Sequence, residues 1–168
     1  MNNIKTQQNE YVFKMYFFWK ELDELIKQHY TRGVNLHEAI TENLACIING
    51  YSLHASEGGS EDAVTRDGKK VQVKGSSNYN DDLTSFGPNS EFDILEFLRL
   101  DRTTDQFYCY RINLVELEKI YVNKNSTFRE MQMTGKRPRF SIIKKIIEPK
   151  NYKEYAIINM QTGDVIYK

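Results

Sequence analysis

The sequence predicts one α/β (α+β) domain in which helices flank a mixed β-sheet. Two helical patterns fill residues 10–49, and short strand patterns separated by Gly, Asp and Asn turns follow them. One more helical pattern lies among the strands at residues 113–123, where it would connect strands of the sheet. The chain of 168 residues is long enough for one hydrophobic core and too short for two.

The composition is that of an ordinary globular protein. Hydrophobic residues make up 40% of the chain and charged residues 27%, which argues against general disorder. No segment approaches the roughly 18 apolar residues of a membrane helix, and the N-terminus lacks the apolar stretch of a signal peptide. We therefore expect a cytoplasmic protein without a membrane partner, in which Cys46 and Cys109 stay reduced in the core.

Residues 10–30 are predicted to form a helix, because their apolar side chains recur at alternating spacings of three and four. The helix either packs only on its own core or also forms an interface between two copies. Because it would otherwise expose aromatic surface, we expect a homodimer with residues 1–34 as its helical dimerisation region. The candidate interface residues are Tyr11, Met15, Phe18, Trp19, Leu22 and Leu25.

A second helix is predicted to run to about Asn49. Asn35 can serve as its N-cap with Glu38 as the capping-box partner, and Gly50 ends it. The Asp-Gly pair at residues 67–68 predicts a hairpin. The remaining predicted elements are a strand at 50–55, hairpin strands at 62–66 and 69–74, a loop at 75–90, a strand at 106–112, a helix at 113–123 begun by Asn113, and strands at 139–147, 154–160 and 165–168; residues 91–100 fit a short helix or a strand.

Charge is distributed unevenly, although the formal net charge is zero. Residues 119–153 contain ten Lys or Arg against Glu130 and Glu148, a net charge of +8 that the rest of the chain balances. A local basic surface of this kind can bind phosphate groups. A solvated face with scattered lysines agrees with the same count.

A polar pair interrupts the second strand of the predicted hairpin. Gln72 and Lys74 are two residues apart, so they share one face of the strand, while Val71 and Val73 share the other. Asp62 stands ten residues before Gln72, directly before the first strand. A carboxylate that holds Mg²⁺ beside a lysine suits phosphodiester hydrolysis, because the metal lowers the pKa of bound water and the ammonium can orient or deprotonate the nucleophile. Without its context, this pattern is common.

The order of these residues resembles that of the PD-(D/E)XK nucleases, in particular the small type II restriction endonucleases of the PvuII type. In that family a segment similar to EGNDAV leads through a hairpin to a strand that carries E-L-K; this sequence reads EGGSEDAV, then VQVK and later DLT. The resemblance is clearest over residues 57–90. It implies a restriction-endonuclease-like fold, with a catalytic and DNA-recognition core at residues 35–168. It also implies a Mg²⁺-dependent type II site-specific deoxyribonuclease with Lys74 as catalytic lysine and Asp62, Gln72 and the Val73 carbonyl as metal ligands.

Gln72 stands where the family usually has a glutamate. Its carbonyl oxygen can bind Mg²⁺ but brings no negative charge. Three explanations stay open: glutamine is natural here, as in Mrr-like branches of the superfamily; a nearby carboxylate (Glu42, Glu57 or Glu61) compensates; or the glutamine is an introduced, inactivating substitution. We favour the first explanation, with catalytic help from Glu42 or Glu61.

Two later segments are candidates for DNA recognition. The resemblance places residues 78–90 in the major groove, where short polar side chains can read base edges, although a mobile surface turn is the alternative. The arginines of GKRPRF, residues 135–140, either read guanine in a GC-containing site or contact phosphates only. The candidate DNA-binding residues are Asn78, Thr84, Ser85, Asn89, Ser90, Lys136, Arg137, Arg139, Lys144 and Lys145.

The sequence thus predicts a homodimeric restriction endonuclease that cuts double-stranded DNA at a short palindrome, because a two-fold protein suits a two-fold site. Its genetic partner would be a cognate DNA methyltransferase of the same restriction-modification system. The alternatives are another nuclease of this fold, such as a Holliday-junction resolvase or an Mrr-like enzyme, and a catalytically inactive DNA-binding module.

Overall fold

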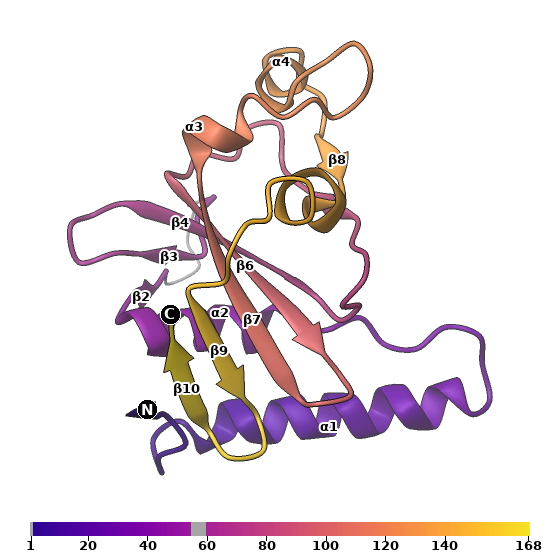
Figure 1. The fold of residues 1–168 in the computed structure, drawn as a ribbon, viewed down its shortest axis with the longest axis vertical. Coiled ribbons are helices and arrows are strands. Elements are labelled where there is room, and N and C mark those ends of the chain that lie inside the picture. Colours follow the sequence, from indigo (N-terminus) through magenta and orange to yellow (C-terminus); the bar gives the residue numbers. More distant parts are fainter. Residues whose placement is uncertain (1, 55–59) are drawn as a thin grey trace.

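A mixed β-sheet forms the centre of the computed structural model, which describes residues 2–54 and 60–168 (Figure 1). Within these residues the sheet has eight strands in the order β1-β10-β9-β7-β6-β4-β3-β2. β4 and β6 pair in parallel, whereas the other neighbours pair antiparallel. The strands are β1 (Asn2–Asn3), β2 (Ser52–Leu53), β3 (Ala63–Val64), β4 (Lys70–Ser76), β6 (Ile94–Asp101), β7 (Gln106–Asn113), β9 (Ala156–Asn159) and β10 (Asp164–Tyr167).

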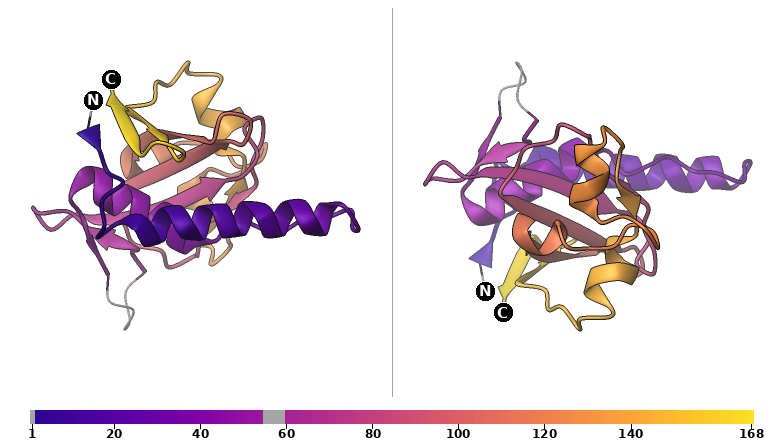
Figure 2. Two further views of the ribbon diagram at one scale, coloured as in Figure 1. Left: turned by 90° about the horizontal axis from the view of Figure 1, so that it is seen from below. Right: turned by 90° about the horizontal axis from the view of Figure 1, so that it is seen from above.

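Helices cover both faces of the sheet (Figures 1 and 2). On one face, α1 (Glu10–Lys27) and α2 (Glu38–Asn49) form a hydrophobic core with residues of β4, β6, β7, β9 and β10. On the other face, α3 (Leu114–Leu117), α4 (Phe128–Met133) and the π-helix η1 (Ile143–Ile147) enclose a second core. The sheet therefore separates two apolar layers, as expected for an α+β protein.

β6 contributes to both cores. Leu95 and Phe97 belong to the second core, and Leu98 and Leu100 belong to the first. The sequence left residues 91–100 open between helix and strand, because a strand buried on both faces has a continuous apolar run without the alternation that marks a half-exposed strand. The structure shows that Ile94–Asp101 form a strand, β6.

The first two predicted helices are confirmed, with one change at a cap. α2 begins after His37, whose Nδ1 accepts a hydrogen bond from the Ala39 N–H at 3.1 Å, so His37 and not Asn35 is the N-cap. Gly50 ends α2 with a φ of 65°, a left-handed conformation that glycine adopts without strain. Among the described helices, none is both long and apolar enough to cross a membrane.

The predicted hairpin is confirmed as well. β3 and β4 pair antiparallel, and Gly68 turns the chain with a φ of 83°. The strand predicted at 106–112 is β7, those at 154–160 and 165–168 correspond to β9 and β10, and the one at 50–55 is reduced to β2.

The helix predicted at residues 113–123 is wrong beyond its first turn. α3 ends at Leu117, and Asn113 makes no capping hydrogen bond with its side chain. α4 then begins after Thr127, which forms a capping box with Glu130 that our reading of the sequence missed.

The strand predicted at residues 139–147 is wrong for most of its length. β8 (Arg139–Phe140) pairs with β5 (Thr84–Ser85) in a separate two-stranded sheet, and the chain then turns into η1. The apolar pairs of this segment fit a helical turn as well as a strand, so the local pattern could not decide between them.

Asp82 supplies the reason for the turn. Its Oδ1 accepts hydrogen bonds from the Ser141 hydroxyl at 2.7 Å and from the Ile143 N–H at 2.9 Å, and its Oδ2 accepts one from the Ile142 N–H at 3.0 Å. A carboxylate in this position satisfies the free N–H groups at the start of a helical turn. The cap comes from a segment remote in sequence.

The segment predicted as a loop at residues 75–90 is anchored at several points. The Ser76 hydroxyl donates to the Asn78 carbonyl at 2.8 Å. Arg99 on β6 donates from Nε to the Tyr79 carbonyl and lies over the Tyr79 ring at 3.8 Å from its centre. Together with β5, these contacts attach the segment to the sheet and to β8.

Candidate functional site

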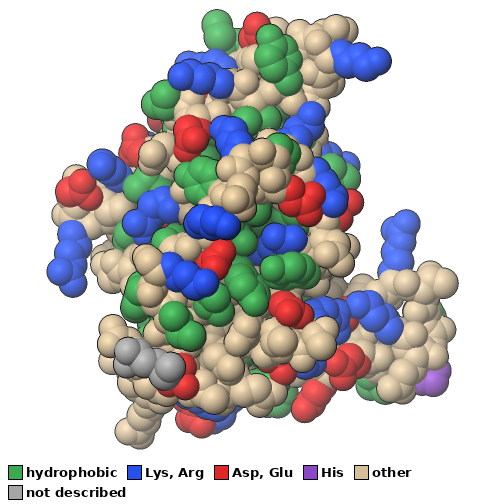
Figure 3. Space-filling model, viewed as in Figure 1, with side chains coloured by type: hydrophobic (Ala, Val, Ile, Leu, Met, Phe, Trp, Pro, Cys, Tyr) green, Lys and Arg blue, Asp and Glu red, His purple; other side chains and the backbone are tan. Residues whose placement is uncertain are grey.

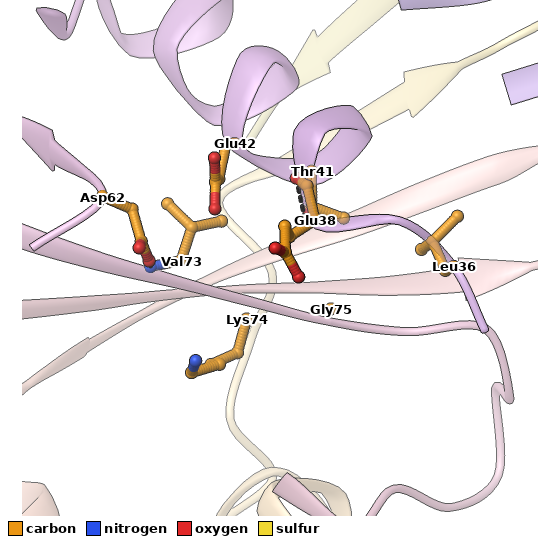
Figure 4. Close-up of a pocket in the computed structure, with 8 residues that line it drawn as sticks. All are labelled: Leu36, Glu38, Thr41, Glu42, Asp62, Val73, Lys74 and Gly75. Carbon is orange, nitrogen blue, oxygen red and sulfur yellow. Dashed lines mark hydrogen bonds between the residues drawn. The ribbon is translucent and has the colours of Figure 1, made fainter. Parts of the chain in front are cut away.

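A polar cavity of about 300 Å³ lies between α2 and the β3–β4 hairpin (Figure 4). α2 and the residues before it supply one wall, Asp62 stands at the start of the hairpin, and β4 supplies the remainder. In Figure 4, Glu42 points from the helix toward β4, while Lys74 projects from the other side of the strand. The lining residues are Leu36, Glu38, Thr41, Glu42, Asp62, Val73, Lys74 and Gly75.

Asp62 is held in place by β4. Its backbone N–H donates to the Val71 carbonyl at 2.9 Å, and its Oδ2 accepts the Val73 N–H at 2.6 Å. The Gln72 side chain donates from Nε2 to the same oxygen. Among the described residues no donor reaches Oδ1, so this oxygen is available to a ligand.

Gln72 contacts Asp62 instead of lining the cavity. The residue is only 5% exposed, and its amide nitrogen faces the Asp62 carboxylate. This arrangement gives Gln72 a positioning role in the described structure. That its carbonyl oxygen binds a metal stays a prediction.

Four charged residues line the cavity, namely Glu38, Glu42, Asp62 and Lys74. Burial raises the pKa of Glu42, and the charges of Asp62 and Glu38 raise it further, while Lys74 lowers it. Burial also raises the pKa of Asp62, against the lowering effects of the Val73 N–H and of Lys74. Burial and the neighbouring carboxylates thus both disfavour negative charge at Glu42 and Asp62. A bound cation would stabilise the charged forms of these carboxylates. Within residues 2–54 and 60–168, no three Asp, Glu, His or Cys side chains are grouped closely enough to hold a metal ion among themselves.

Glu61, one of the carboxylates predicted to assist, lies outside this cavity. Its carboxylate is 3.5 Å from Nδ1 of His54 and 4.0 Å from Nζ of Lys70. Glu57, another candidate, falls outside the described residues. Of the candidates considered from sequence, the described structure brings Glu42 to the cavity.

Glu38 and Thr41 line the cavity although sequence reasoning did not place them there. The sequence suggested Glu38 as a capping partner. Its spacing of four residues from Glu42 puts both carboxylates on one face of a helix, and that spacing was the available signal.

Two comparisons with known proteins bear on this site. Residues 4–149 match the family described as Bsp6I restriction endonuclease. The chain belongs to the Bsp6I restriction endonuclease family. The "Type II restriction enzyme Bsp6I" of Bacillus sp. (strain RFL6) is 41% identical over 158 residues, which cover 91% of this chain and 88% of that protein. The prediction of a type II restriction enzyme is thus confirmed at the level of the family.

Thr84 differs from the other DNA-contact candidates of the first segment in this Bsp6I-family chain. It is 7% exposed, and its hydroxyl donates to Oδ2 of Asp82 at 2.7 Å. Because this hydroxyl is already engaged, Thr84 would have to give up this bond to read a base, and its role at DNA stays a prediction. The exposed or half-exposed candidates of this segment are Asn78, Ser85, Asn89 and Ser90.

The two candidate recognition segments meet in the structure. Ser85 on β5 stands opposite Arg139 on β8, and Lys136, Arg137 and Arg139 are all exposed. Sequence reasoning treated these segments separately, and nothing in their local patterns predicts the pairing. A single nucleic-acid surface can therefore include residues of both.

The lysines of η1 have partners within the protein. Nζ of Lys144 lies 3.2 Å from Glu148, and Nζ of Lys145 donates to the Tyr121 carbonyl at 2.8 Å. On the face shown in Figure 3, Lys and Arg side chains are interspersed with Asp and Glu and do not gather in one patch. A role for these lysines at DNA stays a prediction.

α1 has apolar side chains on two faces. Trp19 is 6% exposed and donates from Nε1 to the Val34 carbonyl at 3.0 Å, so it belongs to the core and not to an exposed interface. Met15 packs partly against the same core. The exposed stripe consists of Tyr11, Phe18, Leu22 and Leu25, of which Phe18 is the most exposed at 68%.

The raised pKa of Glu42 predicts how the metal-free protein responds to pH. In the folded state this carboxyl keeps its proton to a higher pH than in the unfolded chain, because its pKa is raised above the ordinary value of about 4.5. Folding stability is therefore lost as the pH rises through this window, and Glu42→Gln removes that loss. We expect the Gln variant to have a higher free energy of unfolding near neutral pH and a flatter pH dependence. Urea titrations in the presence of a chelator measure both.

Glu21→Gln is the matched control, because Glu21 is exposed on α1 and does not line the cavity. It should leave the pH dependence unchanged. A Glu42→Gln variant that is less stable than wild type over the whole range would contradict the argument from the raised pKa of Glu42.

Proposed function

We propose that the protein is a Mg²⁺-dependent type II endonuclease of the PD-(D/E)XK superfamily, similar to the PvuII type, that cuts double-stranded DNA at a short palindromic, GC-containing site. The observation that carries the proposal is the meeting of Asp62, Glu42 and Lys74 at one cavity in a chain of a restriction endonuclease family. Carboxylates beside a lysine meet the needs of phosphodiester hydrolysis. The proposal that the DNA site contains G·C pairs rests on Arg137 and Arg139, because arginine is the side chain that most often contacts guanine.

The donors at the cavity fit Mg²⁺. Oδ1 of Asp62, the Glu42 carboxylate and the Val73 carbonyl are hard oxygen donors, and Gln72 could add its amide oxygen. Mg²⁺ is commonly held by one or two carboxylates together with substrate phosphate and water, so a third carboxylate is not required. When bound, the ion would polarise the scissile phosphate and lower the pKa of bound water.

The protein's own side chains have separate tasks in this scheme. Lys74 binds a non-bridging oxygen of the scissile phosphate and orients the attacking water. The Val73 N–H and the Gln72 amide fix the orientation of Asp62 before DNA arrives. Glu42, which comes from α2, supplies the negative charge that Gln72 lacks.

Gln72 also favours a second candidate, a DNA-binding module that does not cut, because this position brings no negative charge where the superfamily usually has a glutamate. Incubation of plasmid with the protein and Mg²⁺ distinguishes the possibilities. Discrete fragments indicate a restriction endonuclease, and cleavage that depends on branched or modified DNA indicates a resolvase or an Mrr-like enzyme. Intact plasmid together with a retarded band in a gel indicates a binding module.

Substitutions at Asp62 and Lys74 test the roles proposed for them. Asp62→Ala and Lys74→Ala should each lower the cleavage rate by at least about 10²–10³-fold without unfolding the protein. Asp62→Ala should also tighten metal-free DNA binding, because it removes a carboxylate that repels the scissile phosphate, whereas Lys74→Ala should not. Gln72→Glu should preserve or raise cleavage at low Mg²⁺, because it adds an anionic ligand. A plasmid time course and gel-shift titrations measure these effects.

Asp67→Ala and Lys69→Ala serve as controls, since both side chains are exposed at the hairpin turn. They should cut at wild-type rates. Near wild-type cleavage by Asp62→Ala or Lys74→Ala would contradict the assignment of the site.

We propose further that two copies associate through the exposed stripe of α1, which would set two cavities around a two-fold axis suited to a palindrome. Phe18→Glu places a charge in this stripe and should convert the dimer into monomers that remain folded. Gln28→Glu, at an exposed polar position at the end of the same helix, should leave the dimer intact. Sedimentation velocity at micromolar concentration is the measurement, and a wild-type monomer would refute the dimer.

The basic residues should differ in how they affect DNA binding. Replacing both Lys144 and Lys145 by Ala should weaken binding to cognate and random DNA about equally and reduce its salt dependence, if these lysines contact phosphates. Arg137→Ala should weaken binding to the cognate site more, by roughly 1–3 kcal/mol if it reads a guanine. Fluorescence anisotropy over a series of salt concentrations compares them. Equal losses for Arg137→Ala on both DNAs would make Arg137 a backbone contact.

The proposed activity also suggests the setting in which the protein works. We place it in the cytoplasm, where double-stranded DNA is present. A cognate DNA methyltransferase would protect the host's own sites, as in other restriction-modification systems.

A further inference from the structure

A second polar cavity adjoins the first. It measures about 240 Å³ and shares Leu36 and Gly75 with the cavity of Asp62 and Lys74. At this boundary α2 packs directly on the strand, because a Cβ on Gly75 would lie 2.6 Å from Cγ2 of Thr41. The two cavities therefore lie side by side along the C-terminal half of β4, and this pair of cavities is called the hollow below. The other residues that line the second cavity are Asn35, Ser76, Ser77, Asp82, Leu83 and Thr84.

Leu83 is the exposed apolar residue of this hollow. It is 62% exposed, although most side chains around it are polar. Single exposed leucines are common on protein surfaces, so exposure alone carries no argument. What distinguishes Leu83 is its place beside the candidate catalytic cavity and the way in which its backbone is fixed.

Both neighbours of Leu83 are firmly attached. Asp82 accepts four hydrogen bonds, three from residues 141–143 and one from the Thr84 hydroxyl. Thr84 is buried and pairs with Phe140 in the small sheet. The Leu83 side chain is thus held outward on a backbone that the surrounding contacts position before any ligand binds.

We propose that Leu83 contacts the apolar part of a nucleobase next to the scissile phosphate and helps to determine which DNA sequence is cut. The inference rests on the proposed nuclease function and assigns it a specificity-determining residue. A leucine cannot bind a phosphate or donate to a base edge. Its partners on DNA are the apolar groups of bases, such as the thymine methyl or the face of an unstacked base. A strand whose scissile phosphate lies at Lys74 would continue along the shared hollow toward Leu83.

Asp82 is the positioning residue for this contact. Through its hydrogen bonds to residues 141–143, it joins the backbone of Leu83 to the segment that carries β8 and η1. Leu83 directly precedes β5, and the exposed Arg139 lies on β8, which pairs with β5. The backbones of the two residues are therefore fixed relative to each other. A base contact by Leu83 would be set in register with contacts made by the basic segment.

The test compares Leu83→Ala with Leu83→Met and with Val115→Ala. Val115 is 63% exposed on α3, so its truncation removes a similarly exposed apolar side chain outside the two cavities. The DNA site is first selected by wild-type protein from a pool of random duplexes, which requires binding but no cleavage. Binding to the selected duplex and to a random duplex is then measured with Ca²⁺, and cleavage with Mg²⁺.

Leu83→Ala should lower kcat/KM on the selected duplex by about tenfold to hundredfold, the usual effect of losing an apolar contact of this size. It should reduce the ratio of selected to random binding by a similar factor, without changing the thermal midpoint. Leu83→Met should restore most of the ratio, and Val115→Ala should match wild type.

An unchanged ratio for Leu83→Ala, within roughly twofold of wild type, would overturn the inference while leaving the nuclease proposal intact. If the ratio is unchanged because binding to both duplexes falls equally, Leu83 contacts the DNA backbone and not a base. A wild-type protein that binds a selected duplex but cuts no DNA would refute the nuclease proposal alone, because the ratio still reports on Leu83.

Discussion

The parallel pairing of β4 with β6 is the constraint on which the rest of the structure depends. It runs through six residue pairs, from Val71–Ile94 to Ser76–Arg99, at the centre of the sheet. Parallel neighbours cannot be joined by a tight turn, so residues 77–93 must cross from one end of the pair to the other. This crossover has no helix within it and contains β5 together with the Asp82 cap. The topology therefore requires a long connection beside the Lys74 strand, and Leu83, which is proposed to contact a base, lies on it.

A buried charge network stabilises the strand next to the candidate catalytic one. Glu96 stands opposite Val73 in the parallel pair and has no exposed surface. It accepts hydrogen bonds from Nε of Arg111 at 2.6 Å and from the hydroxyls of Tyr51 and Tyr155 at 2.9 and 2.8 Å. Burial raises the pKa of Glu96, and the charge of Arg111 opposes that shift. Loss of one partner would leave an uncompensated buried charge. The network therefore joins β6 and β7 to the residues that directly precede β2 and β9.

The sequence allowed correct predictions where the signal was local. The Asp-Gly turn identified the hairpin, and its spacing brought Asp62 and Lys74 to one site together with the helical Glu42.

The assignment of Trp19 to the interface, by contrast, does not agree with its burial in the core. α1 has aromatic residues on two faces, and periodicity alone does not say which face meets the core.

The predictions that failed, stayed open or lack a test depended on remote partners. Residues 139–147 look like a strand until Asp82 caps their N–H groups from the crossover. Thr84 looks like a free hydroxyl until its bond to the same carboxylate is known. β6 stayed undecided because only the two cores around it show that both of its faces are buried. In each case the deciding group lies far away in the chain or on another layer.

The contiguity of the two cavities has a consequence for how such a protein can diversify. Every residue that lines them falls between Asn35 and Thr84, and Lys74 and Leu83 lie on one continuous run of chain. An insertion or deletion between these two positions would shift the proposed reading residues and also pull on the strand that carries the lysine. New specificities would therefore arise more readily by exchanging side chains on an unchanged backbone than by remodelling the connection. With the roles proposed for Leu83 and Lys74, recognition and cutting would be mechanically linked, and lineages that keep the activity would inherit the crossover length nearly unaltered.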